Sequence, residues 1–461
     1  MAKWRRSAFL AVALAFGIAF IALLADALLQ SPKPFYYDSG QYWEIAELFT
    51  RNGHFSLMNF EDQFRGYGLP LIYHELRALA RGLTWTDSSI VKLFNALVFA
   101  SVGAVLAPMF AETAWPEQRW GLWRRLALTA LLIVFWDGYL NFPLSDFPGL
   151  AAALLALIAV ARPDKPGWML CAGIACALAI DVRSAYVMLL PALIVLAVWA
   201  FFEQRGSAGA STLRRSVCLG LLVAGFVAVS LPQSLTAHRY FHTWSFVPAA
   251  TLNTAEVYLT PGLASQRYDT YVGGEHPPKM LYADPAGERL LRTQKDGKIT
   301  STSQYFGLIA SHPIAMGALL SRHAINGLDT RYRTGDVENV EGGGNRWLRI
   351  AGFTLVFLAL VRLLWPTARR SLGPARWRYP IALVLGATGV ASPVEARYML
   401  PVYTLVYLLA LAPGWPKPIG SPEPGLRWLR TPAALLLAGA VFAVVIYHVV
   451  SATTSHLTFL Q

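Results

Sequence analysis

The residues that could do chemistry are a small set of acids and arginines between long apolar stretches. Asp38 follows the first apolar stretch, in Tyr-Tyr-Asp-Ser-Gly at 36–40, and Asp146 lies in a short segment between two others. A carboxylate can take a proton from a hydroxyl group, and a guanidinium can bind an anion. Charge at a membrane boundary is costly and indicates function when it clusters. The other members of the set are Asp137, Asp181, Arg183, Glu395 and Arg397.

The composition shows what kind of protein carries these residues. The 461-residue chain is 55% hydrophobic and only 14% charged, with a mean hydropathy of +0.43. A soluble domain carries about 25% charged residues, so the charges here are too few to cover soluble domains of this total length. Stretches of 18 or more mainly apolar residues recur, and each can cross about 30 Å of hydrocarbon. The sequence therefore predicts an all-α polytopic membrane protein and excludes a disordered chain, a coiled coil and a conventional soluble enzyme.

Eleven membrane-spanning helices are predicted from these stretches. The first could be a signal peptide, but its apolar run is long and many further spans follow, which favours an uncleaved helix. Several segments are short, which is typical of tilted or re-entrant helices. The predicted spans are 7–29, 89–111, 124–142, 147–161, 168–181, 184–202, 216–236, 348–365, 379–392, 398–413 and 431–450.

The net charge of +12 is distributed in short clusters between the spans. This arrangement is the positive-inside pattern and not the single stripe or tail of a nucleic-acid-binding protein. It places the N-terminus in the cytoplasm and, with an odd number of spans, the C-terminus outside. The clusters are Lys3/Arg5/Arg6, Arg119/Arg124/Arg125, Arg162/Lys165, Arg205/Arg214/Arg215, Arg369/Arg370/Arg376/Arg378 and Lys417/Arg427/Arg430.

Three parts follow from this topology. Residues 1–236 form an N-terminal transmembrane module with an outer loop at 30–88, residues 237–347 form a large outer loop, and residues 348–461 hold the C-terminal transmembrane helices. Amphipathic patterns at 41–51, 69–82 and 304–326 predict helices lying on the membrane surface. Turn signals in the large loop are Gly273-Gly274, Pro277-Pro278 and Gly342-Gly343-Gly344.

Each charged residue also has a purely structural interpretation. Asp146 could cap the helix that follows it, Glu395 could pair with Arg397, and Asp181 could pair with Arg183. The three cysteines lie in apolar segments and indicate neither a disulfide framework nor a thiolate metal site. The nine histidines show no HExxH spacing, which argues against zinc catalysis.

Several motifs in order resemble one enzyme superfamily. Asp38 follows the first span, and a Tyr-rich amphipathic segment then ends in Asn-Gly at 52–53. Phe-Arg-Gly-Tyr-Gly-Leu-Pro-Leu at 64–71 comes next, followed by the acidic turn around Asp146 and an arginine, Arg183, at the start of the sixth span. Glu-x-Arg-Tyr-x-x-Pro at 395–401 completes the pattern. Together with the large outer loop, the chain resembles the GT-C superfamily of integral membrane glycosyltransferases, which includes protein O-mannosyltransferases and the lipid A aminoarabinose transferase.

The resemblance implies a donor in which a sugar is linked to a polyprenyl phosphate. The acceptor would be an envelope glycan, lipid or protein on the periplasmic face of a bacterial inner membrane, and the transfer would invert the anomeric centre. Asp38 would be the base, and Arg65 the phosphate ligand with Tyr67 beside it. Asp146 would orient the acceptor or a basic side chain. Further binding candidates are Arg183, Glu395, Arg397 and Tyr398.

Other functions and a metal stay open at this point. The sequence indicates no definite cofactor, but a divalent cation could be held by Asp38 and Asp146. A transporter or lipid-linked-oligosaccharide flippase is one alternative, although such proteins usually show repeated halves and charges near the bilayer midplane. An O-antigen polymerase or ligase is another, and the acidic residue directly after the first span argues against it.

Overall fold

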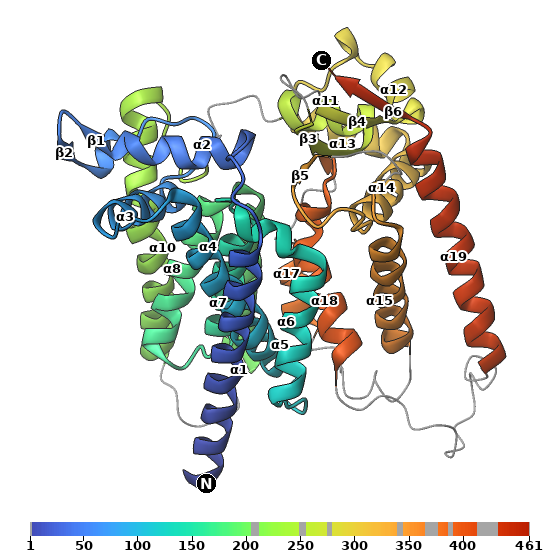
Figure 1. Ribbon diagram of the computed structural model, residues 1–461. Helices are drawn as coiled ribbons and strands as arrows, with labels where there is room; N and C mark the ends of the chain where they lie inside the picture. Colours follow the sequence, from blue (N-terminus) through green and yellow to red (C-terminus); the bar gives the residue numbers. More distant parts are fainter. Residues whose placement is uncertain are drawn as a thin grey trace. The chain divides into compact units, whose positions relative to one another are not determined.

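The computed structural model describes residues 2–203, 212–248, 255–273, 279–338, 344–364, 377–385, 391–412 and 432–460. Over this part of the chain the protein is mainly helical (Figure 1). It divides into two compact units. The first unit comprises Met1–Thr254, Pro374–Thr388 and Leu400–Thr404, and the second comprises Ala255–Gly373, Gly389–Met399 and Leu405–Gln461.

Apolar helices of different lengths make up most of the first unit. They are α1 (Ala2–Leu29), α4 (Asp87–Ala100), the π-helix η3 (Ser101–Leu106), α5 (Ala107–Ala114), α6 (Leu122–Trp136), α7 (Asp146–Val160), α8 (Pro166–Val182), α9 (Leu189–Glu203), α10 (Thr212–Phe241) and α17 (Arg378–Leu385). Glycines let α8 and α10 pack closely. A Cβ atom at Gly173 would lie 1.9 Å from the carbonyl oxygen of Leu222, and one at Gly225 would lie 2.4 Å from that of Leu170. Small residues at a helix interface allow this approach in membrane bundles.

Five helical stretches in the described residues are long and apolar enough to cross a membrane: Phe9–Leu29, Asp87–Ala114, Ser184–Phe202, Leu213–Phe241 and Leu436–Thr454. Shorter apolar helices occupy Asp146–Val160, Pro166–Val182 and Ala396–Leu411. These findings support a membrane-embedded helical protein. A helix lies in each of the eleven predicted segments, but the count of eleven crossings stays a prediction.

The first outer segment forms short elements that follow α1. They are α2 (Tyr37–Ile45), the 3₁₀ helix η1 (Ala46–Phe49), strands β1 (Thr50–Arg51) and β2 (His54–Phe55), the 3₁₀ helix η2 (Leu57–Asn59) and α3 (Gly68–Gly82). The predicted helix at 41–51 is therefore shorter than expected. Asn52 and Gly53 have φ values of 53° and 79° and join β1 to β2. Both central residues of a two-residue hairpin need this positive φ, and Asn-Gly adopts it most readily. The predicted helix at 69–82 is confirmed as α3.

The second unit contains a sheet that was not predicted. Its helical elements include η7 (Ala255–Leu259), α11 (Thr260–Ala264), α12 (Pro285–Arg292), η8 (Lys295–Gly297), α13 (Thr302–Ser311), α14 (Pro313–Gly327), α15 (Arg346–Leu364), η12 (Ala396–Met399), α18 (Leu400–Leu411), whose first residues belong to the first unit, and α19 (Pro432–Thr454). The strands β3 (Ser265–Tyr271), β4 (Lys279–Ala283), β5 (Asp336–Val337) and β6 (Leu457–Leu460) form one sheet in the order β5-β3-β4-β6. β4 is antiparallel to β3 and β6, and β5 is parallel to β3.

The predicted surface helix at 304–326 is two helices. α13 ends at Ser311 and α14 begins at Pro313. Proline has no N–H group to continue a helical ladder, but it suits the first turn of a new helix. Of the turn signals predicted in this loop, Gly274, Pro277-Pro278 and Gly342-Gly343 lie outside the described residues.

Candidate functional site

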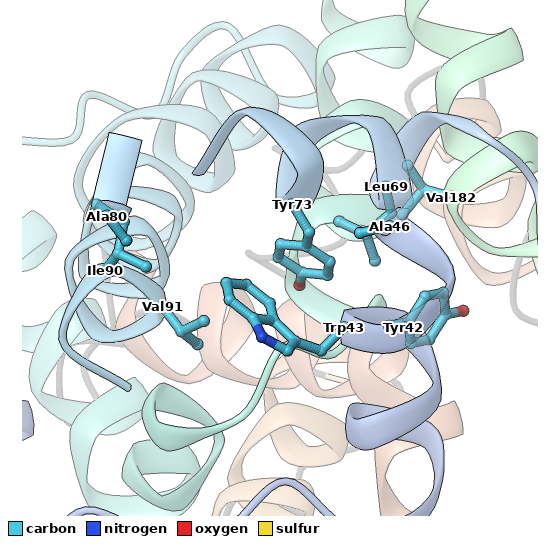
Figure 2. Packing of buried hydrophobic residues seen from close by; sticks show 9 residues of the cluster. All are labelled: Tyr42, Trp43, Ala46, Leu69, Tyr73, Ala80, Ile90, Val91 and Val182. Carbon is cyan, nitrogen blue, oxygen red and sulfur yellow. The ribbon is translucent and has the colours of Figure 1, made fainter. Parts of the chain in front are cut away.

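One aromatic and aliphatic cluster of the first unit fixes the elements that carry the predicted site. Figure 2 shows Trp43 of α2 beside Tyr73 of α3, with ring centroids 5.7 Å apart. Val182, the last residue of α8, belongs to the same cluster. The indole N–H of Trp43 also donates to Oδ2 of Asp87 at 2.9 Å. These contacts hold α2 and α3 against the end of α8, which carries Asp181 and is followed by Arg183.

Asp38 and Arg65 face each other. Oδ1 of Asp38, in the first turn of α2, lies 2.5 Å from Nη2 of Arg65. The guanidinium also donates to Oε1 of Gln41 at 3.2 Å, and its Cζ lies 4.7 Å from the centroid of the Tyr42 ring. The Arg65 and Asp38 side chains are 23% and 34% exposed. The predicted base and the predicted phosphate ligand thus form an ion pair that solvent can reach.

The loop that carries Arg65 is held by its own polar contacts. Oδ1 of Asp62 accepts hydrogen bonds from the backbone N–H groups of Phe64 at 2.8 Å and Arg65 at 2.6 Å. Asp62 therefore closes a local turn of the kind that Asp side chains stabilise. At the start of α2, the hydroxyl of Ser39 accepts from the N–H of Tyr36 at 2.9 Å and donates to the Tyr36 carbonyl. Both sides of the ion pair have fixed backbones.

The two glycines that flank Tyr67 lie directly on Asp181. A Cβ atom at Gly66 would lie 2.1 Å from the carbonyl oxygen of Asp181, and one at Gly68 would lie 2.5 Å from its Oδ2. The Gly68 N–H donates to that Oδ2 at 2.5 Å. Asp181 is buried at the end of α8. The Gly-Tyr-Gly sequence is needed because no side chain fits between this loop and α8, and the contact sets the position of Arg65.

Tyr67 makes its hydrogen bonds within the fold. Its O–H donates to the carbonyl of Val229 at 2.7 Å, and its N–H donates to Oε1 of Gln233 at 3.3 Å. Burial, and to a lesser extent the negative charge of Asp181, raise the pKa of the Tyr67 phenol. The hydroxyl that was predicted beside the donor phosphate therefore anchors the loop to α10.

Asp146 pairs with Arg183. Oδ1 of Asp146 lies 2.7 Å from Nη1 of Arg183, and the two side chains are 1% and 14% exposed. The same Nη1 donates to the hydroxyl of Ser145 at 3.3 Å. Asp146 is the first residue of α7, where the helix dipole also stabilises a negative charge. The proposed pairing of Asp181 with Arg183 is thus wrong: Arg183 contacts Asp146, and Asp181 accepts from Gly68.

Glu395 and Arg397 belong to the second unit and pair with each other. Oε2 of Glu395 lies 2.5 Å from Nε of Arg397, and Oε1 accepts from Nη2 at 3.0 Å. Cζ of Arg397 lies 5.6 Å from the centroid of the Tyr398 ring. Both charged side chains are buried. The neighbouring carbonyl of Val394 accepts from the Tyr268 N–H at 3.0 Å, which fixes this segment beside β3. The structural interpretation, in which the two residues pair, is confirmed.

Neither the known protein families nor the curated proteins contain a match for this chain. The arrangement of its own residues therefore carries the evidence for its function.

A metal has no obvious ligand set in the part of the chain that the structure describes. No group of three or more His, Cys, Asp and Glu side chains is placed there to hold an ion. Asp38 and Asp146 each face an arginine. The divalent cation that these two carboxylates would share stays a prediction.

The sequence interpretation missed two features. Asp181 was noted as a charged residue but not as the partner of the 66–68 loop. A buried network in the second unit, formed by Arg267, Asp269, Asp329 and Arg331 with Arg349, was not noted at all. The sequence signal for this network was two triplets in which Arg and Asp stand two positions apart, Arg-Tyr-Asp at 267–269 and Asp-Thr-Arg at 329–331. They lie within the large outer loop, away from the ends of the predicted spans.

Proposed function

We propose that the protein is a GT-C-like membrane glycosyltransferase. It moves one monosaccharide from a polyprenyl-phosphate-linked donor to an envelope glycan, lipid or protein on the periplasmic face of a bacterial inner membrane. The observation that carries the proposal is the Asp38–Arg65 pair, in which a carboxylate in α2, the next helix after α1, meets a guanidinium from a second segment and both stay open to solvent. A base and an anion ligand are the two groups that the transfer needs.

The pair suggests how the donor would activate the base. Without the donor, Arg65 neutralises Asp38 through the 2.5 Å contact. Arginine binds phosphate through two parallel N–H donors, so a donor phosphate competes for the guanidinium. When Arg65 turns to the phosphate, its contact with the Asp38 carboxylate is broken, and the carboxylate can accept the proton of an acceptor hydroxyl. The stacked ring of Tyr42 and the amide of Gln41 keep Arg65 near this position during the exchange.

The chemical step follows from these two roles. Asp38 accepts the proton of the acceptor hydroxyl as its oxygen attacks the anomeric carbon. The bond from that carbon to the phosphate oxygen breaks, and polyprenyl phosphate leaves with the bonding electrons. Arg65 stabilises the negative charge that develops on the phosphate. Attack opposite to the leaving group inverts the anomeric centre.

Other charged residues have supporting roles in this proposal. Asp181 holds the Gly66–Gly68 loop, and Asp146 orients Arg183. Glu395, Arg397 and Tyr398 stay candidates for substrate binding. The periplasmic orientation is supported by the basic clusters of the sequence, of which residues 369–376 and 417–430 and Arg205 lie outside the described part of the chain.

The substitution Asp38→Asn tests the proposal. It keeps the shape of the side chain, but it removes the basicity, and the contacts between Tyr36 and Ser39 at the start of α2 stay in place. With saturating donor, transfer should fall by roughly 10²–10⁴-fold, the usual contribution of a general base, while donor binding is retained. The matched control is Glu61→Gln, which removes an exposed carboxylate from the same outer segment, where it pairs with Arg51 at 3.1 Å. Near-normal transfer by Asp38→Asn would refute the base assignment.

A further inference from the structure

A cavity of about 590 Å³ lies at the end of the first unit that carries the N-terminus of the chain. Figure 1 shows the N-terminus of α1 and the start of α6 toward this end. The cavity lies where apolar helices stop or start: α5 ends at Ala114, α7 ends at Val160, and α17 begins at Arg378. Three arginines line it, namely Arg119, Arg162 and Arg378, together with Glu112, Thr113 and Tyr379. Its volume is in the range of small-molecule sites, about 300–1,000 Å³.

The acidic residue in the lining is already neutralised by a neighbour. Oε1 of Glu112 accepts from Nη2 of Arg125 at 3.3 Å and from the N–H of Trp120 at 2.9 Å. Arg125 is buried, and its other donors bind the carbonyls of Ala104 at 2.7 Å and Trp120 at 2.9 Å. Glu112 therefore does not cancel the positive charge of the arginines that line the cavity.

Arg119 and Arg162 keep their charge available. In the described residues, neither is paired with a carboxylate. Nη1 of Arg162 donates to the carbonyl of Ile158 at 3.3 Å, and its Cζ lies 4.1 Å from the centroid of the Trp168 ring. These contacts hold the stem and one nitrogen of Arg162 and leave its other N–H groups for a ligand. The third guanidinium, of Arg378, lies 5.1 Å from the centroid of the Tyr379 ring.

The geometry points to a binding site for a phosphate-bearing anion in this cavity, and its position indicates an anionic phospholipid headgroup. Basic pockets between transmembrane helices on the cytoplasmic side bind anionic headgroups, and guanidinium groups suit phosphate oxygens. Because the cavity lies at the ends of apolar helices, a headgroup can enter it while the acyl chains stay in the bilayer. A soluble phosphate ester offers the same chemistry but lacks the acyl chains. The site is separate from the Asp38–Arg65 pair and does not depend on the proposed transfer reaction.

The test compares two double variants of the full chain with equal net charge. Arg119→Gln with Arg162→Gln removes two lining charges, whereas Arg124→Gln with Lys165→Gln removes two charges that do not line the cavity. Binding is measured in nanodiscs by the exchange of phosphatidylglycerol against phosphatidylcholine, and separately with glycerol 3-phosphate in detergent. A charge near the membrane surface contributes about 1 kcal/mol, which is roughly 5-fold in affinity per arginine. The preference for phosphatidylglycerol should therefore fall by roughly 25-fold in the first variant and stay near the wild-type value in the second.

Three other results would count against the inference. Equal preference for phosphatidylglycerol in both double variants would remove the cavity as the site. Loss of glycerol 3-phosphate binding alone would overturn the lipid as the ligand and leave a soluble phosphate ester. If the first double variant does not fold, Arg119→Lys with Arg162→Lys replaces it. Each lysine keeps the charge but loses the paired donors, so part of the preference should remain, and a preference equal to wild type would contradict bidentate phosphate binding.

Discussion

Two regions of the molecule pair aspartate with arginine, one within reach of solvent and the other completely buried. In the first unit, Asp38 faces one arginine, and its side chain is 34% exposed. In the second unit, Asp329 is completely buried and lies among three arginines. It accepts from Nε of Arg331 at 2.8 Å and from Nε of Arg349 at 3.2 Å, and one of its oxygens lies 4.0 Å from Nη1 of Arg267.

In the buried region, the N–H groups of Arg267 also bind acceptors other than Asp329 Oδ2. Arg267 binds both oxygens of Asp269, at 2.7 and 2.8 Å, and donates to the carbonyls of Asn326 at 2.7 Å and Asp329 at 2.9 Å. This network links β3 to the segment after α14, so it fixes the sheet against the helices of its own unit. An ion pair that solvent can reach can exchange a partner for a ligand, whereas a buried network cannot open without leaving unpaired charge.

Removing the central acid of the buried network should have the largest effect. Asp329→Ala leaves three arginines without their shared counter-charge in a buried site. We expect the free energy of unfolding to fall by roughly 3–5 kcal/mol, the usual effect of breaking a buried pair. Asp38→Asn should change it by less than about 1 kcal/mol, because exposed pairs contribute little. Denaturation of both variants in detergent measures the difference, and equal losses would remove the contrast between the two regions.

The stability that Asp329 contributes should depend on pH in the acid range. Burial alone would raise the pKa of Asp329, but the charges of Arg331, Arg267 and Arg349 outweigh it and lower the pKa. A carboxyl group with a lowered folded-state pKa stabilises the fold above its unfolded pKa of about 3.9 and loses this effect as the pH falls through the folded value. The stability difference between wild type and Asp329→Asn should therefore be full near pH 7 and shrink in strong acid.

Substitutions in the exposed Asp38–Arg65 pair should change the rate of transfer more than the stability. Arg65→Ala removes the proposed phosphate ligand and should lower transfer by roughly 10²–10³-fold, which is typical for one group that stabilises a transition-state charge. Arg65→Lys keeps the charge but loses the forked donors, so its loss should be smaller. Donor binding and turnover are measured together with the melting temperature. Unchanged donor binding and turnover in Arg65→Ala would remove Arg65 from the site.

The loop behind Arg65 should give a smaller effect. In Gly66→Ala, the new methyl group meets the backbone carbonyl of Asp181, which cannot turn away, so the loop must shift. We expect roughly 1–3 kcal/mol of destabilisation from overpacking, with a loss of transfer because Arg65 moves. The control is Gly82→Ala at the end of α3, where no atom lies within 4 Å of the new methyl group. Equal behaviour of the two variants would contradict a positioning role for the contact with Asp181.

The sequence alone determined the features that depend on near neighbours. Apolar runs predicted the helices, and the positive φ values of Asn52 and Gly53 fit the turn at which the Tyr-rich segment was expected to end. The resemblance assigned Asp38 and Arg65 to one site, but nothing in the sequence indicated that these residues, 27 positions apart, form an ion pair. The local pattern also could not show that α2 ends at Ile45.

Only the tertiary structure decided which groups pair. Arg183 is two residues from Asp181 but binds Asp146, because the end of α8 turns Asp181 toward the Gly66–Gly68 loop. β6, at the end of the chain, pairs with β4, and Leu457 lies opposite Tyr282. The strand β3 also buries Arg267 and Asp269, so it lacks the alternating apolar pattern by which a half-buried strand is recognised. Helix formation and tight turns depend on residues a few positions apart, whereas the partner of a charge or a strand depends on how distant segments pack.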